Sequence, residues 1–187
     1  MVKKNACVFI SGFGSNLKSL IHKSRDPGFP IKIKLIVSDN EDAKGILHAK
    51  KNSIRYLIID TKKRNYENVI FKEIEKNKIS ILCLAGYMKI ISKKFINKVN
   101  RKIINIHPSL LPKFKGLNTF KRILKNNEKI TGCTVHYVND KLDSGKMIIQ
   151  KSFYIKKDDN LETLKKKTQR LEHLAYPEAI IKIYRYS

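Results

Sequence analysis

Two polar side chains at the end of an apolar strand are the first candidates for chemistry in this sequence. Residues 102–107 read Lys-Ile-Ile-Asn-Ile-His, and Pro108 follows them. Asn105 and His107 lie two positions apart, so in a strand both point to the same face. Pro108 ends the strand because it has no N–H to donate. An amide beside an imidazole can stabilise a carbonyl oxygen that becomes negatively charged, and can transfer a proton. The alternative is a strand end whose polar residues only satisfy hydrogen bonds.

A glycine loop near the start of the chain is the second candidate. Residues 12–16 read Gly-Phe-Gly-Ser-Asn; they follow a first predicted strand at residues 6–11 and precede a helical pattern that begins at Leu17. Strand, loop and helix in this order present backbone N–H groups and a positive helix end to a phosphate. The loop lacks the lysine of a Walker loop and the third glycine of a dinucleotide loop. It therefore favours a single phosphate monoester, with an ordinary glycine turn as the alternative.

The remaining pattern predicts the elements that position these residues. We expect further strands at residues 31–38, 56–59, 79–84, 131–138 and 146–154, and helices at 42–51, 66–79, 95–99 and 158–184, with another ending near 125. This alternation predicts a doubly wound α/β domain with a mostly parallel sheet of about seven strands, an antiparallel C-terminal hairpin and helices on both faces. The last helix is expected to kink or restart at Pro177 and to bury Leu161, Leu164, Leu171, Leu174 and Ala175.

Composition narrows the classes of protein. The 187 residues predict one domain, and the formal net charge of +24 suits either a polyanionic partner or a solvated lysine surface. The lysines are scattered along the chain, which favours the solvated surface. Cys7, Cys83 and Cys133 lie in apolar runs without a C-x-x-C pair, which predicts buried free thiols, a reducing cytoplasmic location and no zinc site. No stretch approaches the ~20 apolar residues that a membrane span needs, and the N-terminal apolar run is too short for a signal peptide.

Four segments together resemble the phosphoribosylglycinamide formyltransferase family. They are residues 12–16, 85–90, 105–112 and 142–145, and the resemblance covers nearly the whole chain in order. The resemblance implies transfer of a formyl group from 10-formyltetrahydrofolate, a co-substrate, to 5-phosphoribosylglycinamide (GAR) in purine synthesis, without a metal. It also implies one domain, 1–187, with a phosphate-binding half at 1–100 and a folate-binding and catalytic half at 101–187.

The resemblance also implies roles for individual residues. Asn105, His107 and Asp143 would form a catalytic trio, in which Asp143 raises the pKa of His107 and a protonated His107 helps Asn105 to hold the oxyanion. GAR would contact Gly12, Phe13, Gly14, Ser15, Asn16, Gly86, Pro108 and Glu172. Folate would contact Lys63, Met88, Lys89, Ile90, Ile91, Asn105, Asn139, Asp140, Lys141, Leu142 and Asp143. Lys63 stands where the family usually has an arginine, so bidentate contact with a carboxylate is lost.

Three rival functions remain beside this one. Methionyl-tRNA formyltransferase shares the Asn-x-His-Pro core but would need an additional C-terminal domain. Formyltetrahydrofolate hydrolase would be expected to carry an N-terminal regulatory domain, whereas the catalytic part here begins at about residue 5. A basic nucleic-acid-binding module without catalysis is the third. We expect small-molecule substrates, no specific nucleic acid, and a monomer or homodimer. His22 and His48 are expected to be solvated, and His136 to face either the site or the core.

Overall fold

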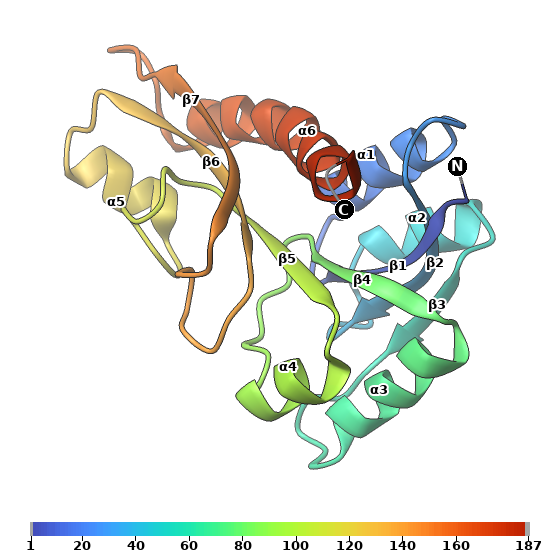
Figure 1. The fold of residues 1–187 in the computed structure, drawn as a ribbon. Helices are drawn as coiled ribbons and strands as arrows, with labels where there is room; N and C mark the ends of the chain where they lie inside the picture. Colours follow the sequence, from blue (N-terminus) through green and yellow to red (C-terminus); the bar gives the residue numbers. More distant parts are fainter. Residues whose placement is uncertain (1, 186–187) are drawn as a thin grey trace. The chain divides into compact units, whose positions relative to one another are not determined.

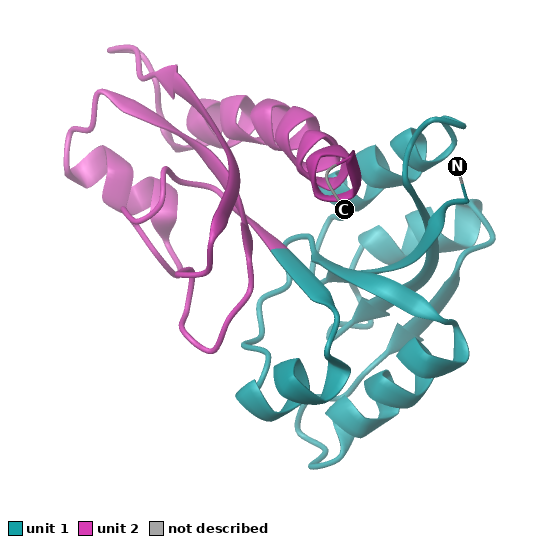
Figure 2. Cartoon of the chain, in the orientation of Figure 1, with its two compact units in different colours: residues 1–104 teal, residues 105–187 magenta. Residues whose placement is uncertain are grey.

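The computed structural model describes residues 2–185, and the chain divides into two compact units, residues 1–104 and 105–187 (Figure 2). Seven strands form a sheet in the order β3-β2-β1-β4-β5-β6-β7. Pairing is parallel for β1–β2, β1–β4 and β2–β3, and antiparallel for β6–β7. The predicted α/β fold, with its antiparallel hairpin after a parallel sheet, is confirmed.

The first unit contains the glycine loop and most of the parallel strands. Its elements are β1 (Lys4–Ile10), α1 (Ser15–Ser24), β2 (Ile31–Ser38), α2 (Gly45–Lys51), β3 (Arg55–Ile58), α3 (Tyr66–Lys76), β4 (Ile79–Leu84) and α4 (Lys93–Val99), and β5 (Lys102–His107) begins in it. Residues 6–10 of β1 have no exposed surface, because helices cover both faces of the strand and an apolar run is buried throughout. Figure 1 shows α1 and α2 on one side of these strands and α3 and α4 on the other.

Parallel pairing brings the carboxyl ends of β1, β2 and β4 to one edge of the first unit. The loops that follow these strands are tied together there. Ser11 N–H donates to the Gly86 carbonyl over 3.2 Å, and Met88 N–H donates to Ser11 Oγ over 2.8 Å. The helix expected at 42–51 begins only at Gly45, because the Asn40 side chain accepts from Asp42 N–H and forms a turn before it.

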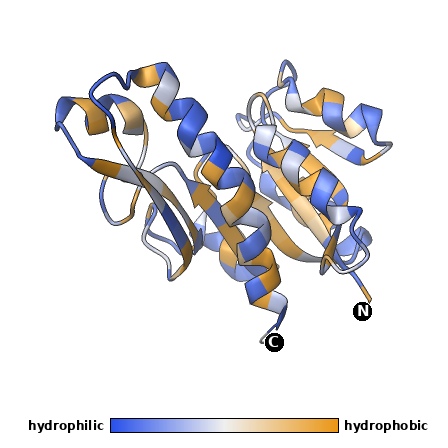
Figure 3. Cartoon of the chain, turned by 90° about the horizontal axis from the view of Figure 1, so that it is seen from above, coloured by the Kyte–Doolittle hydropathy of each residue, from blue (hydrophilic) through white to orange (hydrophobic). Residues whose placement is uncertain are grey.

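The second unit is built on a hairpin and one long helix. Its elements are α5 (Thr119–Lys125), β6 (Ile130–Tyr137), β7 (Met147–Tyr154) and α6 (Leu161–Arg185). α6 packs against β6 and β7. Hydrophobic residues follow the strands and alternate with hydrophilic ones along the helices (Figure 3). None of the helices described within residues 2–185 combines the length and the hydropathy that crossing a bilayer requires.

α6 is continuous through Pro177, so of the two alternatives for the last helix, a kink or a restart, the restart is wrong. The expectation that Leu174 lies inside is also wrong, since this side chain is 60% exposed. The buried line of α6 runs instead through residues four or seven apart, which follow the helical period: Leu164, Thr168, Ala175, Ala179 and Ile183.

Candidate active site

The two polar side chains at the end of β5 both contact the carboxylate of Asp143 in the second unit. His107 Nδ1 lies 3.3 Å from Asp143 Oδ2, and Asn105 Nδ2 donates to Asp143 Oδ1 over 3.4 Å. Strand alternation predicted that these two side chains share a face, and their common partner confirms it. His107 and Asp143 are buried and Asn105 is half-buried. The amide, imidazole and carboxylate that the resemblance named therefore lie together within one unit.

His136 joins this cluster from the neighbouring hairpin. Its Nδ1 lies 2.8 Å from the Tyr137 carbonyl, so Nδ1 carries the proton and donates it there. Its Nε2 lies 3.2 Å from Asn105 Nδ2 and 3.7 Å from Asp143 Oδ1. Of the two directions left open for His136, the structure shows the one toward the site. The alternation of side chains along a strand assigns His136 to one face, but it does not predict which face contacts the cluster.

Two backbone groups that no residue pattern indicates complete the cluster. The Phe114 carbonyl lies 2.9 Å from His107 Nε2, and Gly116 N–H donates to Asp143 Oδ2 over 2.8 Å. Phe114 and Asp143 both have positive φ, 57° and 46°, a conformation that is strained for residues other than glycine. Strain of this kind is stored where the surrounding contacts hold a site in place.

The charges of the cluster are set by opposing effects. Burial lowers the pKa of His107 below its ordinary value, and outweighs the Phe114 carbonyl and the Asp143 carboxylate, which raise it. Burial raises the pKa of Asp143, but hydrogen bonds and charge from His136, Gly116 and His107 outweigh burial and bring this pKa below its usual range. Asp143 raises the pKa of His107 as expected, but this contribution does not decide the net direction, which is downward. Desolvation of the ring is the reason.

The segment that follows His107, residues 108–113, is held in place by a separate network of hydrogen bonds. Thr134 Oγ1 donates to the Ser109 carbonyl over 2.6 Å and accepts from Leu111 N–H and from Gln150 Nε2. Ser109 Oγ donates to the Lys113 carbonyl over 2.6 Å. These bonds fix residues 108–113, and so they fix the carbonyl that follows at Phe114. Thr134 is buried and was not among the predicted site residues.

The glycine loop of the first unit has the form that an anion site needs. Gly14, with φ of 71°, is the N-cap of α1; it offers no side-chain cap to the first N–H groups, and the first turn holds no acidic residue. The loop packs on α2, where Gly45 N–H donates to the Gly12 carbonyl over 2.9 Å. Phe13 is 73% exposed and Asn16 is buried. The role of Gly45 was not predicted, because a glycine at the start of a helix does not indicate from the sequence that it contacts a distant loop.

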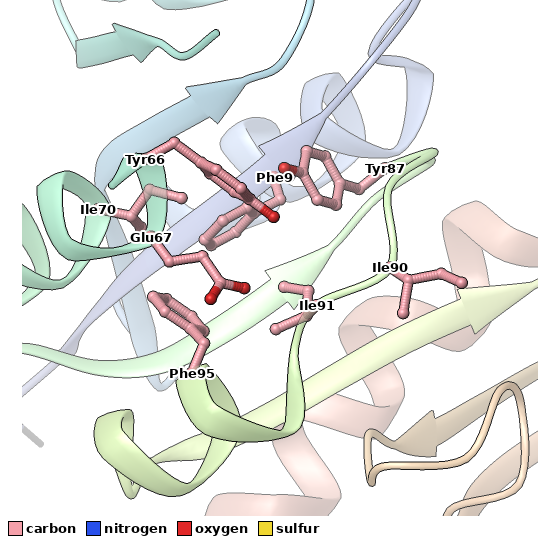
Figure 4. A pocket seen from close by; sticks show the side chains of 8 residues that line it. All are labelled: Phe9, Tyr66, Glu67, Ile70, Tyr87, Ile90, Ile91 and Phe95. Atoms are coloured by element: carbon pink, nitrogen blue, oxygen red, sulfur yellow. The ribbon is translucent and has the colours of Figure 1, made fainter. Parts of the chain in front are cut away.

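The predicted folate residues of the first unit lie together only in part. A small, partly open hollow is lined by Ile90 and Ile91 and by six residues that were not predicted, Phe9, Tyr66, Glu67, Ile70, Tyr87 and Phe95 (Figure 4). Met88, Lys89 and Lys63 are exposed and are not among the lining residues. Burial, with Asp39 and other nearby groups, raises the pKa of Tyr87 above its ordinary value, so its hydroxyl stays protonated.

The remaining predicted residues lie in the second unit. In the loop after β6, Asn139, Asp140, Lys141 and Leu142 are exposed, and Asp143 alone is buried. Asn139 Oδ1 accepts from Lys141 N–H and from Ser144 Oγ, which tightens the turn. Glu172 is half-buried on α6. The burial of Cys133 and the negative charge of Glu172 raise the pKa of the Cys133 thiol to about 12. Within the described residues no group of three or more His, Cys, Asp or Glu could hold a metal ion.

Comparison with known proteins identifies the family of this chain. The formyl transferase family model matches residues 4–180, nearly the whole chain. The chain belongs to the formyltransferase family. It is 35% identical over 183 residues to the phosphoribosylglycinamide formyltransferase of Haemophilus influenzae, covering 95% of this chain and 85% of that protein.

Larger proteins and a solved structure extend the comparison. The chain is 37% identical over 182 residues to the trifunctional purine biosynthetic protein adenosine-3 of Gallus gallus, but this formyltransferase chain spans only 18% of that protein's length. The crystal structure of phosphoribosylglycinamide formyltransferase from Brucella melitensis superposes with a TM-score of 0.92 at 36% identity, covering 100% of this chain and 97% of that one. The family and fold that the motifs implied are therefore confirmed.

Proposed function

We propose that this chain transfers the formyl group of 10-formyltetrahydrofolate to the amine of 5-phosphoribosylglycinamide. The observation that carries the proposal is the buried contact of Asn105, His107 and Asp143 in a chain of the formyltransferase family. The similarity to an enzyme of this name over 85% of that enzyme's length supports the choice of acceptor. The three buried thiols support a reducing cytoplasm as the place where the enzyme works.

The proposed reaction begins with attack on the formyl carbon. The amine nitrogen forms a bond to this carbon, and the carbonyl electron pair moves to oxygen. Asn105 would donate to that oxygen, because its bond to Asp143, at 3.4 Å, is the longest hydrogen bond that the cluster makes and the one most readily exchanged. A doubly protonated His107 would add a second donor by exchanging one of its two protein acceptors, the Phe114 carbonyl or the Asp143 carboxylate, for this oxygen. A well-placed oxyanion donor contributes about 3–4 kcal/mol in other acyl-transfer enzymes.

Collapse of the tetrahedral intermediate completes the transfer. The carbonyl re-forms, the bond from carbon to the folate nitrogen breaks, and tetrahydrofolate leaves. The attacking amine must lose a proton and the leaving nitrogen must gain one. Asp143, kept ionised by its neighbours, would accept the first proton, and His107 would supply the second because its lowered pKa makes the protonated ring a stronger acid.

The substrate phosphate is assigned to the glycine loop of the first unit. Backbone N–H groups at the start of α1, with residues 14–16, would hold it, and Lys63 and Lys89 would meet the carboxylates at the far end of the folate. Each assignment rests on the residues of its own unit. A monomer or homodimer acting on these small molecules, without specific binding of nucleic acid, completes the proposal.

The test is release of tetrahydrofolate, followed by absorbance, with GAR, water and methionyl-tRNA as acceptors. We expect turnover with GAR, and a loss of about 100-fold or more in His107→Ala and in Asp143→Asn. The exposed residues His22 and Asp158 supply matched controls, His22→Ala and Asp158→Asn, which should retain turnover. Near-normal activity in either site variant, or preference for water or methionyl-tRNA, would refute the proposal.

A further inference from the structure

One glutamine on the edge strand of the sheet reaches the segment that follows His107. Gln150 lies on β7 directly opposite Thr134 on β6. Its amide nitrogen lies 3.0 Å from the Leu111 carbonyl and 2.8 Å from Thr134 Oγ1. A carbonyl oxygen only accepts, so the group that faces it is the NH2, which has two N–H bonds and donates to both partners. Gln150 is exposed, and no motif of the sequence includes it.

The donation from Gln150 helps to set the direction of every hydrogen bond at the buried Thr134 hydroxyl. A hydroxyl has one hydrogen to donate and two lone pairs that accept. Thr134 Oγ1 accepts from Gln150 and from the Leu111 N–H, the latter over 3.1 Å. Its own hydrogen is therefore left for the Ser109 carbonyl, 2.6 Å away. Leu111 is thus held at both of its backbone groups, at the N–H by Thr134 and at the carbonyl by Gln150.

The segment held in this way leads directly to an acceptor of the His107 ring. Ser109 Oγ donates to the Lys113 carbonyl over 2.6 Å, which closes a turn over residues 109–113. The next carbonyl, that of Phe114, lies 2.9 Å from His107 Nε2. Phe114 has a φ of 57°, a strained value that the surrounding contacts must hold. A shift of the turn would therefore carry this carbonyl away from the ring.

We propose that Gln150 is a positioning residue, whose two N–H donors hold the turn before Phe114 so that the Phe114 carbonyl stays on His107 Nε2. The inference rests on the proposed function and deepens it, because it names a residue that acts through His107. With the carbonyl in place, the ring keeps one orientation, in which Nδ1 lies 3.3 Å from Asp143. Without it the ring is free to turn, and formyl transfer slows although both substrates still bind. A displacement of about 1 Å costs on the order of 100-fold in rate, so partial loosening should cost about tenfold.

Variants that keep either the shape or the donors of Gln150 test the inference. Gln150→Glu keeps the shape, but its carboxylate cannot donate to the Leu111 carbonyl, so kcat with GAR should fall about tenfold. Both KM values should stay within about twofold, because no residue assigned to either substrate is altered. Gln150→Lys supplies an ammonium with three donors and should keep kcat within about threefold of the unaltered chain. Ser152→Glu is the matched control, since it places the same charge two residues further on, on the same face of β7, at an exposed position.

A measurement that needs no turnover separates failure of this inference from failure of the proposed function. The Phe114 carbonyl protects the Nε2–H proton of His107 from exchange with water, and NMR of the 15N-labelled ring gives the exchange rate. This rate should rise about fivefold or more in Gln150→Glu, and stay unchanged in Gln150→Lys and in Ser152→Glu. Gln150→Met removes the donors without adding charge, so it gives the same test if the carboxylate unfolds the strand.

The outcomes divide cleanly between the two proposals. Absence of turnover in the unaltered chain would refute the function alone, and the exchange rates would still decide the inference. Unchanged exchange in both Gln150→Glu and Gln150→Met would overturn the inference, whatever happens to kcat. An equal change in Ser152→Glu, or a rise in KM without a fall in kcat, would overturn it as well.

Discussion

His107 meets one acceptor at each ring nitrogen, the Phe114 carbonyl at Nε2 and the Asp143 carboxylate at Nδ1. Both contacts favour the doubly protonated ring, while burial favours the neutral one. Burial is the stronger effect, so the pKa lies below the ordinary value. The two acceptors thus provide hydrogen bonds for the doubly protonated ring, and burial of the ring makes this protonated form more acidic.

The titration of His107 can be followed by NMR of its ring. We expect a pKa below about 6.5, and a further decrease in Asp143→Asn, because the carboxylate raises this pKa. Since the pKa is lower in the folded than in the unfolded chain, the stabilisation from the neutral ring is complete above about pH 6.5 and declines as pH falls toward the folded-state pKa. Asp158→Asn is the control. A higher pKa in Asp143→Asn would contradict the assignment.

The sequence indicates side chains of the site better than its backbone groups. Asn105 and His107 could be paired from strand alternation alone, whereas Asp143 was found only through the resemblance, since a turn-rich loop also explains an aspartate there. The Phe114 carbonyl and Gly116 N–H could not be found, because every residue carries these groups and their direction depends on φ and ψ. The lowered pKa of His107 was missed for a related reason. It depends on how deeply the ring is buried.

At the scale of elements, the glycine loop depends on the helix that packs against it. A Cβ built on Gly14 would lie 2.7 Å from Gly45 Cα, and Gly14 has positive φ. A Cβ on Gly45 would in turn lie 2.6 Å from Ile10 Cδ1 and 3.1 Å from both the Gly12 carbonyl oxygen and Gly14 Cα, so it would be crowded by side chain and backbone. Strand β1, the loop and α2 therefore approach at one point where only glycine fits.

Gly14→Ala should disturb this point of contact. We expect a loss of about 1–3 kcal/mol in the free energy of unfolding, from the strained φ and the clash with backbone. The KM for GAR should rise more than the KM for folate, because the loop is assigned to the substrate phosphate. Urea denaturation and steady-state kinetics measure the two effects. Gly28→Ala is the control, since a Cβ there meets only Asp26 Oδ1 at 3.4 Å. Equal behaviour of the two variants would contradict this account.

The elements themselves were predicted well where burial dictates the pattern. β2 and β4 have the predicted ends. β4 and the second half of β2 are apolar runs buried on both faces, as a parallel sheet requires, and the first half of β2 alternates buried isoleucine with exposed lysine. Leu174 was misplaced because leucine was taken as inward without following the helical period through Thr168 and Ala175. The hydrogen bond from Ser92 Oγ to Glu67 was not foreseen, since it joins residues 25 positions apart.

For the molecule as a whole, the net charge of +24 opposes folding, because like charges are closer together in the folded chain than in the unfolded one. Salt screens this repulsion over about 10 Å at 0.1 M. We expect the Tm to rise by about 2–4 °C when NaCl is raised from low to physiological concentration, the shift that ~1 kcal/mol produces in a chain of this size. KCl should act equally if ionic strength is the cause. A constant or falling Tm would contradict this explanation.

The burial of Cys7, Cys83 and Cys133, none with any exposed surface, has a practical consequence. Cys7 and Cys83 lie on the adjacent strands β1 and β4 in the middle of the first unit, and Cys133 lies on β6 in the second. A thiol-alkylating reagent can reach them only when those strands separate. The rate of labelling at each position, read by mass spectrometry, would thus time the opening of each unit separately, without any dye or engineered probe.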